Sequence, residues 1–183
     1  MLERKIVCIT GMPGAGKSFV SEAFSRRGGK IIVMSQQLRR KYVEEGYAGE
    51  SFENFAARMR EKYGRDIVAK LSLEGIETKD SLVIMEGVRN REEVDLFSRK
   101  GKTVVVAVHA PPRLRRERLL ARMRDVEETT IEAIVKRDME NLKLGIGEVI
   151  AMADYMIVND DGLDQFKSRI EEVVRRVLED GSS

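Results

Sequence analysis

A glycine-rich segment near the N-terminus carries the strongest chemical signal in this 183-residue chain. Its spacing is G-x-x-x-x-G-K-S, that of a phosphate-binding loop, and its residues are Gly11, Met12, Pro13, Gly14, Ala15, Gly16, Lys17 and Ser18. The glycines let the backbone approach an anion closely, so that successive N–H groups can point at phosphate oxygens. The pattern predicts binding of a nucleoside triphosphate, and its spacing differs from that of a dinucleotide site.

The last two residues of this loop suit the chemistry of a nucleotide bound with a metal ion. A helical pattern begins near Lys17, and its positive N-terminal end favours phosphate. The Lys17 ammonium can reach the β- and γ-phosphates, and the Ser18 hydroxyl can take one coordination position of Mg²⁺, which prefers oxygen ligands. We therefore expect ATP and Mg²⁺ as cofactors, with GTP left open by the sequence.

An acidic residue, Glu86, follows a third apolar run and is the next candidate for chemistry. In a parallel sheet the carboxyl ends of the strands share one edge, where ligands gather, so Glu86 should lie beside the phosphate loop. It is a candidate catalytic residue and metal ligand, although an acid there could also do no more than cap a loop. Arg89, three residues later, is placed to bind an anionic acceptor.

Six arginines and no lysine occur between Arg113 and Arg124. Helical spacing places Arg115, Arg118 and Arg122 on one face, and we expect this arginine stripe to face outward. Guanidinium groups are planar, bidentate donors suited to phosphate, and an arginine that contacts the transferring phosphoryl group raises the rate by roughly 10³ to 10⁵. The alternative is that the stripe only solvates its helix.

The elements that must position these side chains follow from hydrophobic patterning. Short apolar runs without polar alternation predict strands covered on both faces, at 6–9, 30–34, 82–85, 103–108 and 155–158. Helical spacing occupies the intervals 19–27, 92–99, 113–124, 130–144 and 163–178. This alternation predicts an α/β fold with a doubly wound, five-stranded parallel sheet.

One interval, residues 35–80, is longer than a simple crossover between strands requires. It contains helical stretches at 37–45, 52–63 and 66–73, punctuated by glycines. We interpret it as a helical insertion in one domain that spans 1–183, and the alternative is a long crossover.

Composition narrows the possible partners and the compartment. There are 33 basic and 31 acidic residues, and the net charge of +2 lacks the strong basic excess of a dedicated nucleic-acid binder. No apolar stretch approaches the roughly 18 residues of a membrane span. The single cysteine, Cys8, cannot form an internal disulfide, so we expect a cytoplasmic protein.

Taken together, these segments resemble the P-loop nucleotide kinases, including adenylate kinase and dephospho-coenzyme A kinase, over essentially the whole chain. The likeness is strongest to an uncharacterised archaeal family described as adenylate-kinase-related, through residues 87–89, 140–150 and 153–159. This resemblance implies a nucleoside monophosphate kinase-like fold. It also implies an acceptor-binding role for the insertion at 35–80 and an arginine-rich lid region at 113–144.

The resemblance also assigns roles to individual residues. Arg118 and Arg122 match the lid arginines that frame adenine and phosphates, and Arg137 matches the arginine just after the lid. Asn159, after the last strand, matches an adenine-side residue of the dephospho-coenzyme A kinase group. Arg39 resembles the arginine that binds the acceptor's phosphate.

The chain departs from this pattern at Gln36, where the kinases have an aspartate. An amide cannot accept a proton or bind Mg²⁺ as a carboxylate does, so Glu86 must serve if a base is required. The lid is also short, because only about residues 125–129 separate its two helices.

Two functions are compatible with these residues. The first is an ATP- and Mg²⁺-dependent phosphotransferase acting on a nucleotide or nucleotide-like small molecule. The second is a nucleotide-dependent switch or slow ATPase that binds a macromolecule such as RNA, which the neutral Gln36 favours. The sequence names neither the acceptor nor the oligomeric state.

Overall fold

The computed structural model describes residues 4–122 and 130–179, without the side chains of residues 48 and 122. The short lid segment expected at 125–129 therefore lies outside the described residues. The described part contains no helix long and apolar enough to cross a membrane.

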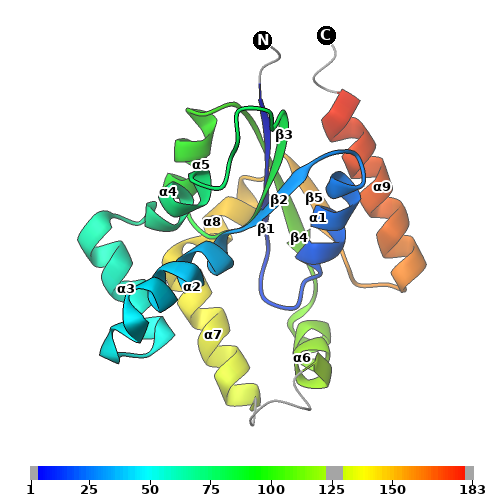
Figure 1. Cartoon of the computed structure of the whole chain (residues 1–183). Helices are drawn as coiled ribbons and strands as arrows, with labels where there is room; N and C mark the ends of the chain where they lie inside the picture. Colours follow the sequence, from blue (N-terminus) through cyan, green and yellow to red (C-terminus); the bar gives the residue numbers. More distant parts are fainter. Residues whose placement is uncertain (1–3, 123–129, 180–183) are drawn as a thin grey trace.

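A five-stranded sheet forms the centre of the molecule (Figure 1). Its strands pair in parallel in the order β2-β3-β1-β4-β5, which confirms the expected fold class. The strands are β1 (Lys5–Thr10), β2 (Lys30–Val33), β3 (Leu82–Val88), β4 (Lys102–His109) and β5 (Tyr155–Val158). Because β1 is central, the loop that follows it opens at the middle of the carboxyl edge, where ligands bind in such sheets.

Helices cover both faces of this sheet. They are α1 (Lys17–Ser25), α2 (Met34–Glu44), α3 (Phe52–Tyr63), α4 (Ile67–Leu73), α5 (Arg91–Ser98), α6 (Pro112–Arg122), α7 (Ile131–Leu144), α8 (Ile146–Ala151) and α9 (Leu163–Glu179), with a 3₁₀ turn, η1 (Gly46–Gly49). The expected helices are all present, with ends shifted by a few residues. Helix α8 was not predicted, since its six residues give too short a pattern.

The alternation of side chains along β1 divides the core into two layers. Ile6 and Cys8 pack on one face, with residues of α2 to α5 and α8, whereas Val7 and Ile9 pack on the other, with α1 and α9. Successive strand residues point to opposite faces, which explains why a run without polar residues forms this strand.

The insertion packs directly on the first of these layers. Phe55 and Met59 of α3 and Val68 of α4 belong to the same buried cluster as Ile6 and Cys8 of β1. Burying each such side chain stabilises the fold by about 1.5–3 kcal/mol. The helices at 34–73 are thus fixed to the sheet by a shared core.

Candidate functional site

The phosphate loop connects β1 to α1 and leaves its amides available. Gly16 caps α1 with φ +106°, and a Cβ there would meet the Asn159 side-chain nitrogen at 2.7 Å, so only glycine fits. Among the described residues, no hydrogen-bond acceptor serves the backbone N–H groups of Gly14, Lys17 and Ser18. Unsatisfied amides at a helix N-terminus form a binding site for an anion.

The Lys17 ammonium lies over its own loop. It donates to the carbonyl oxygens of Gly11 at 2.7 Å and of Met12 at 3.2 Å. Burial lowers the pKa of Lys17 to about 8; the Glu86 carboxylate opposes this shift, while nearby arginines, first Arg89, add to it. The side chain is charged at neutral pH and is surrounded mainly by positive groups, which favours an anionic ligand.

A bulge at the end of β3 sets the position of Glu86. The pairing of β1 with β3 shifts between Ile9 and Thr10, so that Gly87, with φ +100°, is the extra residue. One carboxylate oxygen of Glu86 accepts a hydrogen bond from the Ser21 hydroxyl at 2.5 Å. Ser21 lies on α1, one turn after Lys17, so this hydrogen bond joins the helix after the phosphate loop to β3.

A cavity of about 120 Å³ lies against the phosphate loop. It brings together six of the predicted site residues. Lys17, Glu86, Arg89 and Arg137 come from α1, β3, the β3–α5 loop and α7, and Gly11 and Pro13 belong to the phosphate loop. The remaining lining residues are Val33, Ser35, Gly87, Val88, Asn141 and Ile146. The Lys17 ammonium, the Glu86 carboxylate and the guanidinium groups of the two arginines thus line one small space.

A larger hollow, of about 530 Å³, lies between α1 and α9. Its charged side chains are paired with one another, as in the contact of Arg27 with Glu171. It contains none of the predicted site residues, so we place the site at the phosphate loop.

The two arginines of the cavity are unpaired. Within the described chain, neither the Arg89 nor the Arg137 guanidinium forms an ion pair. Burial lowers the pKa of Arg89 to about 10, and the charge of Arg60 adds to this effect. Both guanidinium groups have donors free for an anion.

Behind Arg89 lies a buried acid that was not predicted from the sequence. Glu93 of α5 is 1% exposed and accepts a hydrogen bond from the Arg89 backbone N–H at 2.7 Å. Burial raises the pKa of Glu93 to about 7. Asn90 caps the same helix by accepting from the Glu93 N–H at 2.9 Å, and the spacing N-x-x-E is a sequence signal for this cap.

The arginine stripe does not face outward as a unit, which corrects the expectation for α6. Arg115 is 4% exposed and forms a bidentate ion pair with Asp138 of α7, at 2.9 and 2.8 Å. It also donates to the Pro13 carbonyl of the phosphate loop at 3.0 Å. Periodicity alone could not show this contact, because the partner lies 23 residues away.

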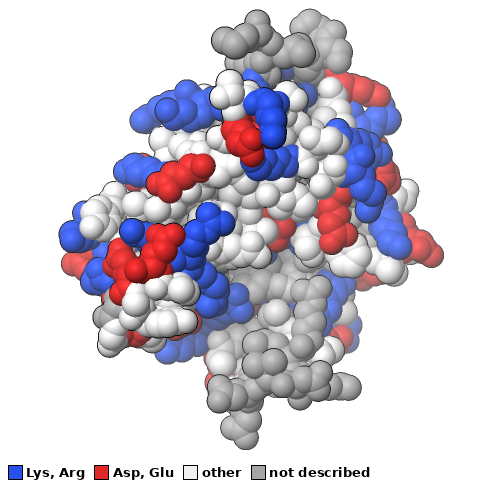
Figure 2. All heavy atoms as spheres, in the orientation of Figure 1, with Lys and Arg blue, Asp and Glu red and all other residues white. Residues whose placement is uncertain are grey.

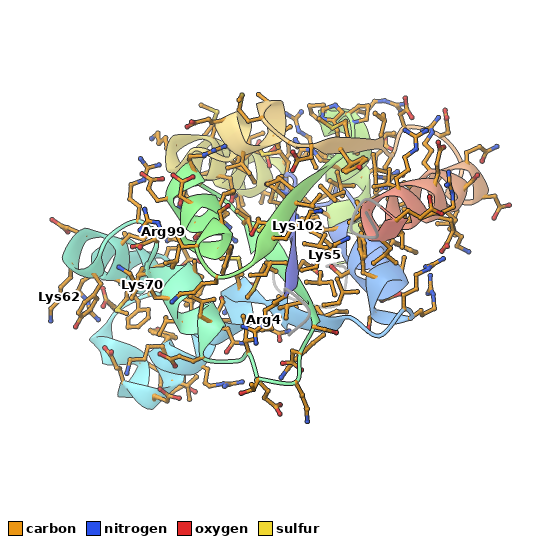
Figure 3. The ribbon with its side chains drawn as sticks, turned by 90° about the horizontal axis from the view of Figure 1, so that it is seen from above. Arg4, Lys5, Lys62, Lys70, Arg99 and Lys102 are labelled. Atoms are coloured by element: carbon orange, nitrogen blue, oxygen red, sulfur yellow. The ribbon has the colours of Figure 1, made fainter. Side chains whose placement is uncertain are left out.

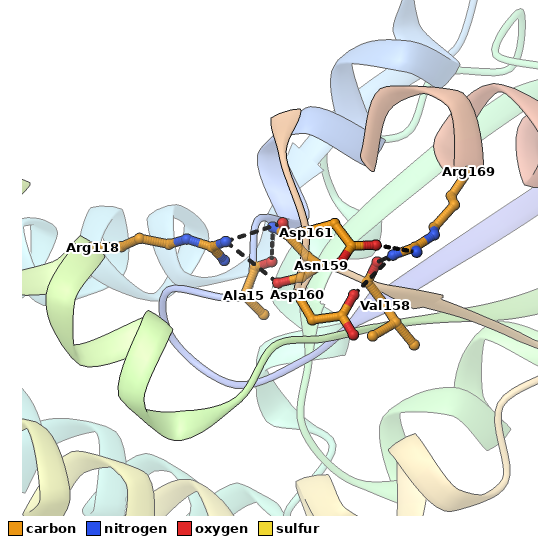
Figure 4. Close-up of polar contacts among 7 residues, drawn as sticks. All are labelled: Ala15, Arg118, Val158, Asn159, Asp160, Asp161 and Arg169. Carbon is orange, nitrogen blue, oxygen red and sulfur yellow. Dashed lines mark hydrogen bonds and ion pairs between the residues drawn. The ribbon is translucent and has the colours of Figure 1, made fainter. Parts of the chain in front are cut away.

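Arg118 and Asn159, both predicted from the resemblance, lie together (Figure 4). The Arg118 guanidinium donates to the side-chain oxygen of Asn159 at 3.1 Å and to its backbone carbonyl at 3.3 Å. Asn159 is buried and donates to the Ala15 carbonyl at 2.8 Å. On the other side of this loop, Arg169 of α9 holds Asp160 at 2.9 Å. These contacts join α6, the loop after β5 and the phosphate loop.

Two further predicted residues, Arg39 and Ser18, do not line the cavity. Arg39 is exposed on α2, with its guanidinium 4.2 Å from the centre of the Phe52 ring, and does not line the cavity. Ser18 is half-buried in the first turn of α1. Arg122 ends α6, but its side chain lies outside the described part.

Comparisons with known proteins agree with this geometry. A family model described as "AAA domain" matches residues 7–143, which run from β1 to α7. A UPF0200 protein of Sulfurisphaera tokodaii is 48% identical over 174 residues, covering 95% of this chain and 98% of that protein.

Two solved structures share the fold. A shikimate kinase from Bacteroides thetaiotaomicron superposes with a TM-score of 0.63 at 17% identity, over 95% of this chain and 98% of that one. A gluconokinase from Sinorhizobium meliloti gives a TM-score of 0.57 at 14% identity, over 98% and 95%. At these identities the likeness concerns the fold alone. The family match and the UPF0200 relative show that the chain belongs to the AAA-domain family of P-loop proteins and to the UPF0200 proteins.

Proposed function

We propose that this protein is an ATP- and Mg²⁺-dependent phosphotransferase that acts on a small-molecule acceptor, for which the sequence resemblance suggests a nucleotide or nucleotide-like compound. The observation that carries the proposal is the cavity in which Lys17, Glu86, Arg89 and Arg137 adjoin a phosphate loop with unsatisfied amides. Phosphoryl transfer needs mainly positioning and charge neutralisation, and these groups provide both.

The donor set of the loop fits a nucleotide with Mg²⁺. The amides of the loop and Lys17 would hold the phosphates, and Asn159 with Arg118 would border the base. The described chain contains no group of three or more acidic, histidine or cysteine side chains that could hold a metal ion by themselves. Mg²⁺ at such sites needs only one or two protein oxygens besides phosphate, here Ser18 and Glu86. When bound, the metal ion would neutralise charge on the phosphates.

The chain's own residues have separate tasks in this proposal. Ser21 orients the Glu86 carboxylate, which leaves its other oxygen able to accept the proton of an acceptor hydroxyl. Arg137 would stabilise charge on the transferring group, and Arg89 would bind the acceptor. Arg118 and Arg122 stay candidates for contacts with the nucleotide. The names of the two neighbours, a shikimate kinase and a gluconokinase, support a small-molecule acceptor.

The alternative, a switch that binds RNA, is less well supported, because the arginine stripe does not form an exposed surface: Arg115 is buried. Figure 3 shows Arg4 at the amino end of the strands and Lys70 on α4; Arg4 donates to the Asp80 carbonyl at 2.9 Å, and Lys70 contacts Asp66 at 2.8 Å. Positive and negative side chains also alternate over the face in Figure 2.

We further propose a cytoplasmic location, which the buried, unpaired Cys8 supports.

Thermal unfolding with nucleotide tests the first half of this function. A ligand that binds only the folded state stabilises it by about 2.7 kcal/mol at 100 times its dissociation constant. We expect ATP with Mg²⁺ to raise the Tm of the wild type by several degrees and that of Lys17→Ala much less. An equal shift for both proteins would show that the loop does not bind the nucleotide.

A further inference from the structure

The structure narrows the acceptor, on the basis of the proposed function. We propose that the acceptor is a compact acid, a hydroxylated molecule bearing a carboxylate or a phosphate monoester, rather than a nucleotide. Arg89 and Arg137 bind its anionic group, and its hydroxyl receives the phosphoryl group beside Glu86. The observations that carry this are the size of the cavity, its fixed walls, its lining and its charge.

The cavity is small for an acceptor of nucleotide size. Its volume is about 120 Å³. Sites for drug-sized molecules enclose about 300–1,000 Å³. Because Pro13 and Lys17 of the phosphate loop line the same cavity, part of this volume belongs to the transferring phosphoryl group.

The wall formed by the insertion is anchored in the core. Val33 and Ser35 line the cavity, and between them Met34 is 1% exposed. Leu38, one turn later on α2, is 2% exposed and belongs to the same cluster as Phe55. Moving this wall outward would expose such side chains at a cost of about 1.5–3 kcal/mol each.

No described residue that lines the cavity is aromatic, so nothing there can stack on a base. The rings of the insertion are used elsewhere. Tyr42 packs against Phe52, Phe55 and Tyr47, with ring centroids 5.7, 5.1 and 5.3 Å apart, and its hydroxyl donates to the Glu50 carbonyl at 2.5 Å. These rings pack against one another, and Phe55 among them belongs to the core cluster shared with the sheet.

The charge of the cavity favours an acidic acceptor. Its described lining carries three cations and one carboxylate. Lys17 is assigned to the phosphates of ATP, and Glu86 to the metal ion or the acceptor's proton. Arg89 and Arg137 then form no ion pair among the described residues. Arg60, whose buried Nε has no hydrogen-bond partner among these residues, adds positive charge near Arg89, and the buried Glu93 carboxylate offsets part of it. Arg89 is half-buried and Arg137 is exposed, and guanidinium groups without an ion pair favour an anion.

The chemical step balances without a further reagent. The acceptor hydroxyl oxygen forms a bond to the γ-phosphorus of ATP, and the bond from that phosphorus to the β–γ bridging oxygen breaks. ADP leaves with the bridging oxygen, and the hydroxyl proton passes to Glu86 and then to solvent. The product is the phosphate ester of the acid.

The test is ADP release with MgATP and four groups of acceptors. They are small hydroxycarboxylates such as glycerate and gluconate, small phosphate monoesters such as glycerol 3-phosphate, uncharged polyols such as glycerol, and the nucleoside monophosphates AMP and CMP. We expect acceleration by one of the two acid groups, and the group that acts identifies the anion. Three results would overturn the proposal: acceleration only by a nucleoside monophosphate, acceleration by polyols equal to that by the acids, or no acceleration by either acid group. Failure of MgATP to bind would instead refute the proposed function.

Variants of the arginines separate acceptor binding from nucleotide binding. For Arg89→Met we expect the KM of the acid to rise about 10- to 100-fold, while the KM of MgATP changes less than about twofold. Arg91→Met is the matched control, since Arg91 is exposed on α5 and pairs with Asp95 at 3.0 Å outside the cavity. A rise in the KM of MgATP equal to that of the acid in Arg89→Met would contradict the assignment.

Discussion

At the scale of single residues, Lys17 connects the fold to nucleotide binding most directly. Its ammonium is held by carbonyls of its own loop, and burial among positive groups lowers its pKa to about 8. Because phosphate binds the charged form, deprotonation of Lys17 opposes binding of ATP.

This gives a pH dependence with a defined direction. Below pH 8 Lys17 is charged and the dissociation constant of MgATP should vary little, whereas between pH 8 and 9 it should rise up to about tenfold. Isothermal titration calorimetry across pH 7–9.5 measures this dissociation constant. Lys17→Arg is the control, because guanidinium stays charged, and its dissociation constant should be flat across this range. A parallel rise in both proteins would exclude Lys17 as the cause.

Residue types and spacing predict the site only where the motif is local. Lys17 and Ser18 follow from the loop, and Glu86 and Arg89 from the end of a strand, whereas Arg137 and Asn159 needed the resemblance to kinases. Ser21 was not predicted, because its contact with Glu86 spans 65 residues of sequence. Long-range hydrogen bonds leave no periodic signal in either partner.

At the scale of elements, the bulge in β3 positions Glu86 and Arg89. We expect Gly87→Ala to cost about 1–2 kcal/mol of stability, because φ is +100° there, and also to reduce phosphoryl transfer by displacing Glu86. Gly28→Ala is the matched control: Gly28 has φ +86°, and at both glycines an added methyl group would meet no atom within 4 Å. Denaturant unfolding should show similar losses of stability in the two variants. Turnover measurements should show a loss of activity only for Gly87→Ala. Equal activities would mean that the bulge does not set the site.

The pair of Arg115 and Asp138 joins α6 to α7 beside the phosphate loop. Asp138→Asn leaves a buried guanidinium without its counter-ion, and we expect a loss of about 3–5 kcal/mol in the free energy of unfolding. Glu117→Gln breaks an exposed pair with Arg113 on the same α6 and should change stability by less than about 1 kcal/mol. Equal, small losses in urea unfolding would contradict a structural role for the buried pair.

At the scale of the whole molecule, the pattern of apolar runs predicted the parallel sheet and the helices on both its faces. The strand order was not predicted, because the pairing of β1 with β3 and β4 joins segments far apart in sequence. The two-layer core around β1 follows from the alternation of Ile6 to Ile9. Cys8 lies fully buried in this core, and burial raises the pKa of its thiol.

Cys8 therefore reports on opening of the whole fold. We expect no reaction with a thiol reagent in the native state and labelling only through global unfolding, at a rate that falls as stability rises. MgATP should slow labelling of the wild type and leave Lys17→Ala unchanged. Rapid labelling of the native protein would show that β1 is exposed by local motion, which a closed core around this strand does not allow.

Transfer of phosphate to a compact acid can be followed by the fate of the γ-phosphoryl group of ATP. The protein would be incubated with ATP labelled with ¹⁸O in that group and with the acid acceptors, and the products would be measured by mass spectrometry beside Lys17→Ala. We expect label in a phosphate ester of a small acid, formed by the wild type and not by the variant. Label found only in inorganic phosphate, with every acceptor unchanged, would contradict it.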